Sequence, residues 1–205
     1  MFKRLLRKST DKFTLIVSDQ HRYVWFKVRK CGSTSITEVL PKPARDFATR
    51  DYKASDYPGY FKFSFVRNPY DRLLSNYLNK IKGQRREDIR AGYLKNLDFW
   101  EGMSFDDFAY QVCDLPDDKC DRHYKSMHKV FDVEGVDFIG RLENFTEDMN
   151  FVLRAISGEE STPIPHKNRT QKASYTEYFS DQLRDRVTLR YKADLELFDY
   201  SFAQE

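Results

Sequence analysis

The stretch from Tyr23 to Leu40 constrains the fold of this chain most strongly. It begins with an apolar, aromatic and β-branched run, passes through a loop of small residues, and continues with apolar side chains at helical spacing. That order is typical of a strand, a tight loop and the N-terminus of a helix. The first backbone N–H groups of a helix lack partners and carry partial positive charge, so small residues there let a phosphate approach closely. The stretch therefore predicts a phosphate cradle.

The loop of this stretch supplies the groups that would contact a phosphate, namely Lys30, Cys31, Gly32, Ser33, Thr34 and Ser35. Lys30 adds a mobile cation, and the hydroxyls add donors. The loop is not the G-x-x-x-x-G-K-[ST] motif of nucleotide triphosphatases, because it has one glycine and its lysine precedes that glycine. Considered alone, it is explained equally well by a helix that Ser33 or Thr34 caps.

A second strand, loop and helix unit follows. Residues 61–67 alternate aromatic and polar side chains, Pro69 stands where a first helical turn favours proline, and residues 70–81 have helical periodicity. Phe13 to Val17 predicts a strand that forms a hairpin with the one before the loop, and residues 137–141 predict another short strand. Strands that alternate with helices indicate an α/β fold with a mainly parallel sheet, whose ligands collect at the carboxyl ends of the strands.

Four other segments carry weaker patterns. Residues 44–60 are polar and are expected to be a surface connection. Residues 84–90 are a charge run, for which a solvated helix face or loop is expected rather than a binding patch. Ser104 is expected to cap a helix. Residues 178–197 have apolar side chains on one helical period.

The composition excludes several classes of protein. Of 205 residues, 33% are charged and 40% hydrophobic, which suits a globular protein and argues against disorder. The net charge of +3 is the difference between 35 basic and 32 acidic residues, too weak to indicate nucleic-acid binding. Three scattered cysteines predict neither a disulfide framework nor a zinc site, so a cytoplasmic location is expected. Residues 1–12 are expected to be a polar, flexible segment, whose cations could instead contact an anionic membrane surface.

Two signatures together point to a family. Lys30 with Gly32-Ser33-Thr34, followed by R-N-P-Y-D-R-x-x-S-x-Y from Arg67 to Tyr77, resembles the cofactor signatures of sulfotransferases that use 3′-phosphoadenosine 5′-phosphosulfate (PAPS). The resemblance is closest to the carbohydrate branch with the chondroitin and dermatan enzymes, and it covers most of the chain. It implies one sulfotransferase domain over residues 1–205, with a three-layer P-loop-like fold whose mainly parallel sheet is flanked by helices.

The resemblance also implies roles for the cofactor-binding residues. Lys30 and residues 31–35 would hold the 5′-phosphate, with Cys31 acting through its backbone. Arg67 and Ser75 would hold the 3′-phosphate, and an arginine suits that task because its planar fork makes paired hydrogen bonds. Arg169 is expected on the phosphate side of the cofactor. The alternatives are an ion pair between Arg67 and Asp71, an ordinary helix position for Ser75, and a simple loop cation at Arg169.

Two residues would act in the chemistry that the resemblance implies. Lys30 would stabilise the bridging oxygen as the sulfuryl group leaves, and His123 would remove the acceptor proton, since its pKa lies near working pH. His123 aligns with a histidine of the carbohydrate branch, but Tyr124 and Met127 depart from that branch's pattern at the acceptor side. His128 is the second candidate for the base, and a structural role stays open for both histidines. No metal is expected.

The activity expected from this resemblance is sulfuryl transfer to a hydroxyl of a carbohydrate or glycolipid. A pseudoenzyme or binding module that holds the nucleotide without turnover is the alternative from another class, and a missing base would favour it. A nucleotide-dependent kinase is disfavoured, because no aspartate motif for Mg²⁺ accompanies the loop. Nucleic-acid binding is the last alternative and would show steep salt dependence. The acceptor's identity and the oligomeric state do not follow from these residues.

Overall fold

The chain folds into alternating strands and helices, as seen in a computed structural model that describes residues 11–42, 44–90, 92–158 and 174–203. The strands and α-helices are β1 (Asp11–Ser18), β2 (Tyr23–Phe26), α1 (Ser33–Val39), β3 (Arg45–Tyr52), β4 (Phe61–Val66), α2 (Pro69–Lys80), α3 (Phe105–Asp114), β5 (Phe138–Arg141), α4 (Phe145–Ser157), α5 (Asp181–Arg190) and α6 (Lys192–Leu197). Single 3-10 turns are η1 (Ala54–Asp56), η2 (Arg86–Asp88), η3 (Met127–Lys129), η4 (Leu142–Asn144) and η5 (Tyr175–Tyr178). Residues 1–10 lie outside the described part, and β1 already includes the end of the segment 1–12 that was expected to be flexible.

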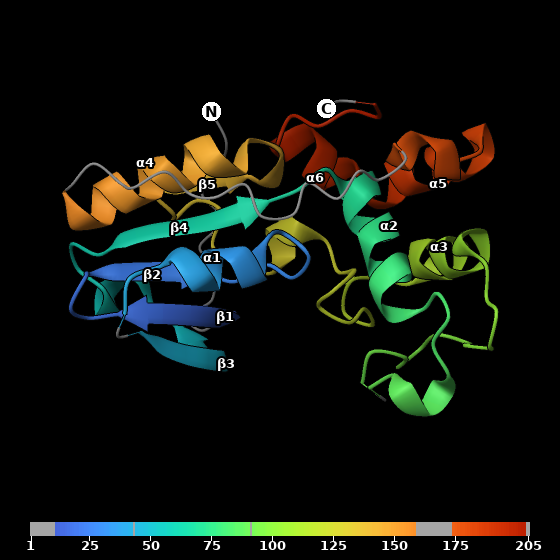
Figure 1. Cartoon of the computed structure of the whole chain (residues 1–205), viewed down its shortest axis with the longest axis horizontal. Helices are drawn as coiled ribbons and strands as arrows, with labels where there is room; N and C mark the ends of the chain where they lie inside the picture. Colours follow the sequence, from blue (N-terminus) through green and yellow to red (C-terminus); the bar gives the residue numbers. More distant parts are fainter. Residues whose placement is uncertain (1–10, 43, 91, 159–173, 204–205) are drawn as a thin grey trace.

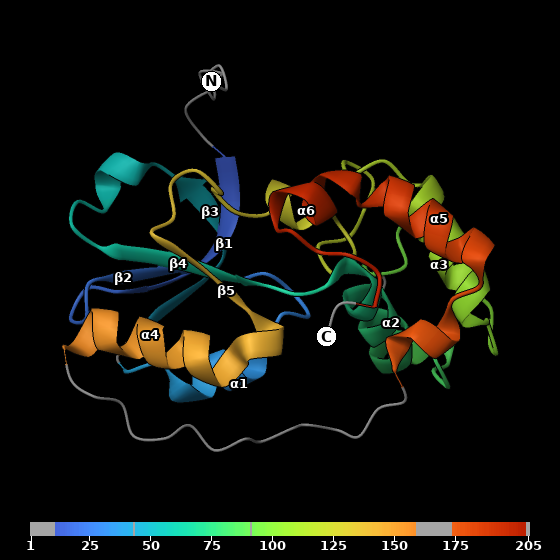
Figure 2. The same ribbon diagram turned by 90° about the horizontal axis from the view of Figure 1, so that it is seen from above.

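One five-stranded sheet in the order β3-β1-β2-β4-β5 forms the centre. β1 is antiparallel to both of its neighbours, whereas β2, β4 and β5 pair in parallel. All strands but β1 therefore run the same way, which confirms the predicted α/β fold with a mainly parallel sheet. The hairpin of β1 and β2 is confirmed too, and β3 pairs with β1 at the edge of the sheet. Helices α1 and α4 lie together along one face of the sheet (Figure 2).

The middle of the sheet is buried on both faces, as parallel strands normally are. All four residues of β2 are buried, and the Trp25 ring stacks on Phe63 of β4 with centroids 6.4 Å apart. Ser64 is the buried polar residue of β4. Its hydroxyl donates to the Phe26 carbonyl at 3.0 Å, so its burial leaves no hydroxyl unsatisfied. This buried pair of strands holds the two loops that follow them in fixed positions.

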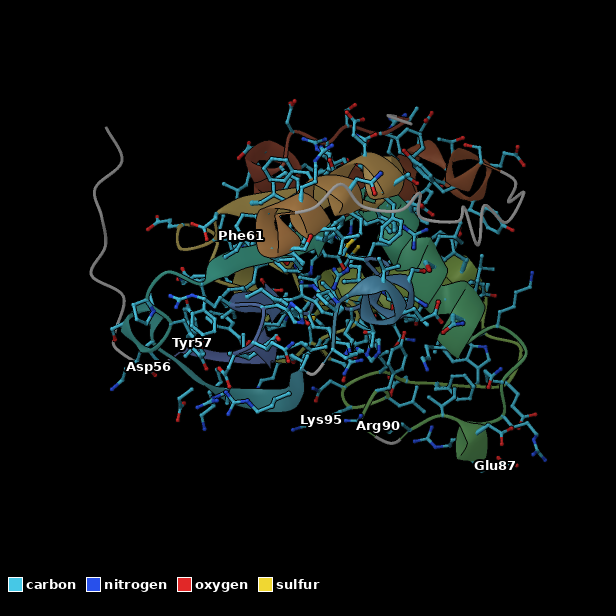
Figure 3. All side chains as sticks on the ribbon, turned by 60° about the vertical axis from the view of Figure 1, so that its left-hand side comes forward. Asp56, Tyr57, Phe61, Glu87, Arg90 and Lys95 are labelled. Carbon is cyan, nitrogen blue, oxygen red and sulfur yellow. The ribbon has the colours of Figure 1, made fainter. Side chains whose placement is uncertain are left out.

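The segment 44–60 was expected to be a surface connection, and that prediction is wrong. It contains β3 and η1, and Tyr52 and Tyr57 are both buried, with rings stacked at 5.8 Å. Figure 3 shows Asp56 and Tyr57 at the end of the molecule opposite Glu87. A polar edge strand lacks the apolar run that identifies a central strand, since its burial comes from a few aromatic residues.

The helices after β4 form a second group. Helices α2, α3 and α5 lie together beyond the carboxyl ends of the parallel strands (Figure 1). Pro69 opens α2 and Ser104 caps α3, as predicted. The expected single helix over 178–197 is instead divided into α5 and α6. The backbone leaves the helical region at Tyr191, whose buried hydroxyl donates to the Tyr124 carbonyl at 2.5 Å.

The described helices also bear on membrane crossing. None of them combines the length and the apolar character that a crossing would require.

Candidate functional site

The loop between β2 and α1 has the backbone that a phosphate cradle needs. Gly32 is the N-cap of α1, has φ of 74° and makes no side-chain cap hydrogen bond. The left-handed φ favours glycine here, and a Cβ at this position would also lie 2.7 Å from Leu142 Cδ1, which would have to shift. Ser33 is the first residue of the helix rather than its cap. The explanation of the loop as a helix capped by Ser33 or Thr34 therefore does not hold.

The other residues of this loop differ in exposure. Thr34 is exposed, while Lys30, Ser33 and Ser35 are half-buried. Lys30 has φ of 66°, a left-handed conformation that costs a non-glycine residue about 1 kcal/mol. Cys31 is buried, and this burial raises the pKa of its thiol to about 12. Since that thiol stays protonated and enclosed, Cys31 can serve an anion only through its backbone.

Arg67 joins the two signature loops. It follows β4, its side chain is only 10% exposed, and its Nη1 donates to the Lys30 carbonyl at 3.2 Å. Its Nε and Nη2 also donate to one oxygen of Asp71, at 2.9 and 2.5 Å. The ion pair named as the alternative is thus present. It holds the guanidinium beside the Lys30 loop, so the ion pair and a phosphate contact are compatible.

The structure says less about two further candidate cofactor-binding residues. Ser75 lies on α2 and is 8% exposed, two turns after the residues that end β4. Arg169 lies outside the described residues, together with the rest of 159–173. Their roles stay predictions.

His123 lines a cavity of about 310 Å³ with Arg29, Asn79, Lys80, Gln84, Asp88, Ile89, Arg90, Tyr93 and Asp121. Part of the charge run 84–90 therefore forms a wall of this cavity instead of only a solvated surface. Figure 3 shows Arg90 beside Lys95, on the same side of the molecule as Glu87. The Tyr93 ring meets the imidazole edge-on at 5.3 Å. The cavity combines a titratable group with cations and an aromatic wall.

Asp121 orients His123. Its Oδ1 accepts from the His123 backbone N–H at 2.9 Å and lies 2.5 Å from the ring Nδ1. Burial lowers the pKa of the imidazole below its ordinary value, and the hydrogen bond to Asp121 opposes this. Burial alone would raise the pKa of Asp121, but the hydrogen bonds from the His123 ring and backbone lower it. A neutral imidazole with Nδ1–H on Asp121 leaves Nε2 as a proton acceptor.

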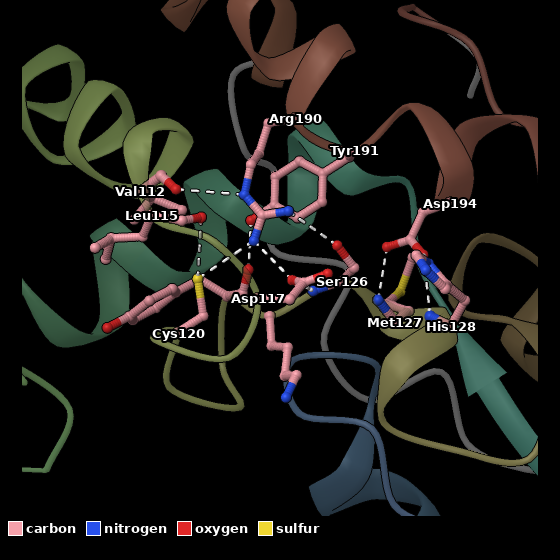
Figure 4. A network of polar contacts seen from close by, with 12 residues as sticks. Val112, Leu115, Asp117, Cys120, Ser126, Met127, His128, Arg190, Tyr191 and Asp194 are labelled. Carbon is pink, nitrogen blue, oxygen red and sulfur yellow. Dashed lines mark hydrogen bonds and ion pairs between the residues drawn. The ribbon is translucent and has the colours of Figure 1, made fainter. Parts of the chain in front are cut away.

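His128, the second candidate for the base, is held elsewhere. Its Nδ1 lies 2.6 Å from the fully buried carboxylate of Asp194, which also accepts from the backbone N–H groups of Met127 and His128. Figure 4 shows this group beside a second one, in which Arg190 donates to Ser126 and Asp117. His128 thus fixes a turn and is not among the residues that line the cavity with His123.

The sequence reasoning missed Arg72, which is 1% exposed. Its guanidinium donates to the carbonyls of Arg29 at 3.1 Å, Lys125 at 2.8 Å and Arg122 at 3.2 Å. Asn76, one turn later, donates to the His123 carbonyl at 2.7 Å. Helix α2 therefore fastens the loop before α1 to the segment that carries His123.

No clear signal in the sequence marks Arg72 or Asp121 for these roles. Their spacing indicates only a helix face and a polar loop, and the partners of Arg72 are main-chain atoms. Asp121 offered one hint, because a carboxylate two residues before a candidate base is close enough to orient it. In the described residues no group of His, Cys, Asp and Glu side chains could hold a metal ion.

Comparisons with known proteins agree with this geometry. The family model described as the sulfotransferase family matches residues 13–201. Carbohydrate sulfotransferase 14 of Danio rerio is 25% identical over 200 residues, which cover 82% of this chain and 54% of that protein. Carbohydrate sulfotransferase 11 of Rattus norvegicus is 28% identical over 170 residues, 69% of this chain and 47% of that protein.

Coverage varies among the relatives. Carbohydrate sulfotransferase 10 of Xenopus laevis is 25% identical over an alignment of 252 residues. This alignment covers 97% of this chain and 71% of that protein. The chain spans about half the length of the first two relatives. No solved structure gives a significant match. Because the family model covers nearly the whole chain, the protein belongs to the sulfotransferase family and is related to the carbohydrate sulfotransferases.

Proposed function

We propose that this chain transfers a sulfuryl group from PAPS to a hydroxyl of a carbohydrate or glycolipid acceptor. The observation that carries the proposal is the contact of Arg67 with the Lys30 carbonyl, since it brings the two signature loops together at neighbouring strand ends. Family membership supports the donor, and the names of the relatives support a carbohydrate acceptor.

The donor set of the two loops fits a nucleotide with two separate phosphate groups. The helix N-terminus offers backbone N–H groups without a side-chain cap, and Lys30 adds a cation beside them. Arg67 offers a second cation at the end of the next strand, and its partner Asp71 fixes the direction of its fork. Ser33, Thr34 and Ser35 add hydroxyl donors in the first turn. Each site would bind one anionic group, and the nearly buried arginine would bind it with little loss of side-chain entropy.

Three residues have separate roles in the proposed transfer. The bound donor supplies an activated sulfuryl group on its 5′-phosphate. The acceptor oxygen forms the new S–O bond as the bond from sulfur to the bridging phosphate oxygen breaks. His123 Nε2 takes the acceptor proton, and Asp121 stabilises the imidazolium that results. Lys30 offsets the negative charge that develops on the bridging oxygen. The Asp121 and His123 pair favours turnover over a binding module that holds the nucleotide unchanged.

Calorimetry tests the donor assignment. Wild type should bind 3′-phosphoadenosine 5′-phosphate more tightly than ATP, and Arg67→Ala should lose at least about tenfold in affinity, the range for a charge-assisted phosphate contact. Arg85→Ala serves as the matched control, because this exposed arginine also pairs with a neighbouring aspartate, Asp88. Equal binding of ATP, or unchanged affinity in Arg67→Ala, would remove the donor assignment.

A second variant tests the base. His123→Ala should abolish sulfuryl transfer and retain nucleotide binding, since His123 lines the cavity and not the loop before α1. Full activity in this variant would exclude His123 as the base.

A further inference from the structure

A carboxylate lies beside the residues that are expected to hold the 3′-phosphate of the nucleotide. Asp71 stands four residues after Arg67 and four residues before Ser75. It belongs to the first turn of α2, and Ser75 follows one turn later on the same helix. Residues four apart share a face of a helix, so Asp71 and Ser75 face the same way. An anion that binds to Arg67 and Ser75 therefore meets a side chain of its own charge.

Asp71 uses one side of the Arg67 guanidinium. Its Oδ2 accepts from Nε at 2.9 Å and from Nη2 at 2.5 Å, and the Lys30 carbonyl accepts from Nη1 at 3.2 Å. An arginine has five N–H groups, of which Nε carries one and each Nη carries two. In the described part of the chain, these contacts leave one N–H on Nη1 and one on Nη2 for an anion. The carboxylate and a phosphate can thus share one guanidinium.

The repulsion between two such anions is considerable, because the site is shielded from water. The Arg67 side chain is 10% exposed and that of Asp71 is 26% exposed. Partly buried charges are screened less by salt than exposed ones. For a dianion about 6 Å from a carboxylate, Coulomb repulsion weakens binding roughly tenfold even at the dielectric constant of water.

Other contacts than the one with Asp71 also hold Arg67 in place. The Lys30 carbonyl keeps Nη1, and the nearly buried side chain has little room to turn. The backbone that follows is fixed as well, since the Asn68 N–H donates to Glu143 at 2.7 Å. Loss of the Asp71 charge therefore removes the repulsion and leaves the arginine beside the Lys30 loop.

We propose that Asp71 limits the affinity of this site for the nucleotide and thereby speeds the release of the product, 3′-phosphoadenosine 5′-phosphate. The inference rests on the proposed function, since it takes Arg67 as a ligand of the 3′-phosphate. In the free protein, Asp71 neutralises the nearly buried guanidinium. In the complex, it repels the phosphate that the same guanidinium binds. Each turnover ends only when the product leaves, and product release limits kcat in many enzymes.

Calorimetry with two nucleotides isolates this effect. The product nucleotide carries a 3′-phosphate, whereas adenosine 5′-phosphate lacks it. Asp71→Asn should bind the product roughly tenfold more tightly than wild type does, and it should bind adenosine 5′-phosphate as wild type does. The gain should shrink as salt is added, because salt screens the repulsion. Stopped-flow displacement should show slower release of the product from the variant.

Three further variants complete the test. Asp71→Ser removes the charge with a smaller side chain and should show the same gain. Asp71→Glu keeps the charge and should bind the product as wild type does. Glu87→Gln is the matched control, because this exposed carboxylate also pairs with a nearby arginine, Arg85, and should leave both affinities unchanged. Circular dichroism verifies that each protein folds.

Three results would overturn the role of Asp71: the neutral variants bind the product no more tightly than wild type, they gain equally for adenosine 5′-phosphate, or they release the product as fast as wild type. The proposed function is judged on wild type alone. It fails if wild type binds the product no more tightly than adenosine 5′-phosphate. If wild type prefers the product and the neutral variants gain nothing, only the role of Asp71 is rejected.

Discussion

Replacing Arg72 with lysine should destabilise the protein strongly, although the charge is kept. The arginine is 1% exposed and spans the carbonyls of Arg29, Arg122 and Lys125 with three nitrogens. One ammonium group cannot occupy three such positions, so at least two of these hydrogen bonds are lost. Each hydrogen bond from a charged donor contributes about 1.5 to 3 kcal/mol, and the abandoned carbonyls lose the donor that this arginine supplied. The expected loss in the free energy of unfolding is about 4 kcal/mol.

Urea denaturation followed by circular dichroism measures this loss, and thermal melting gives a second value. A loss of about 4 kcal/mol in a chain of this length should lower Tm by about 8 to 16 °C. The control is Arg85→Lys, because that arginine is 64% exposed and pairs with Glu87 and Asp88 close by in the chain; its unfolding midpoint should not change. If Arg72→Lys unfolds at the same urea concentration as wild type, the three hydrogen bonds do not stabilise the fold and the reasoning is refuted.

Three other predictions concern single residues. Asp121→Asn should lower kcat about 100-fold, the scale of general base catalysis. It should also move the acid limb of the kcat profile to lower pH, since the carboxylate opposes the lowered pKa of His123; an unchanged rate and limb would exclude the orienting role. Gly140→Ala should cost about 1 to 3 kcal/mol in urea unfolding, because its Cβ would meet the buried Phe65 ring at 2.5 Å; an unchanged midpoint would contradict this close packing. Cys31 should resist alkylation by iodoacetamide at pH 8 and react in urea, since its burial raises the thiol pKa to about 12; rapid labelling of the native protein, detected by mass spectrometry, would contradict that burial.

The part of the fold that follows from local patterns could be predicted. β2 and β4 are buried central strands, so their apolar runs are continuous enough to recognise, and Pro69 marks the start of α2. β3 could not be found, because an edge strand needs few apolar residues. The break between α5 and α6 could not be predicted either. Tyr191 continues the helical spacing of apolar residues, although its hydroxyl donates to the Tyr124 carbonyl in another segment.

The same distinction between local patterns and tertiary contacts applies to the residues of the candidate site. Lys30 and Arg67 follow directly from the two signatures, and their contact follows from the pairing of two adjacent strands. Arg72 could not be identified, because it binds carbonyls that any residue would carry. The cavity of about 140 Å³ that Arg29 and Lys125 help to line is also a tertiary feature: its cations come from β1, from the loop after β2 and from residues 122–129, and only the fold brings them together.

The contacts of Arg190 and Asp194 determine the order in which parts of this chain can fold during synthesis. They hold Asp117, Ser126, Met127 and His128 on both sides of His123, yet they stand more than sixty residues later in the chain. During synthesis the sheet and the loop before α1 can form first, while the segment with the histidine still lacks its anchors. The pocket around that histidine is therefore completed only after α5 and α6 have left the ribosome.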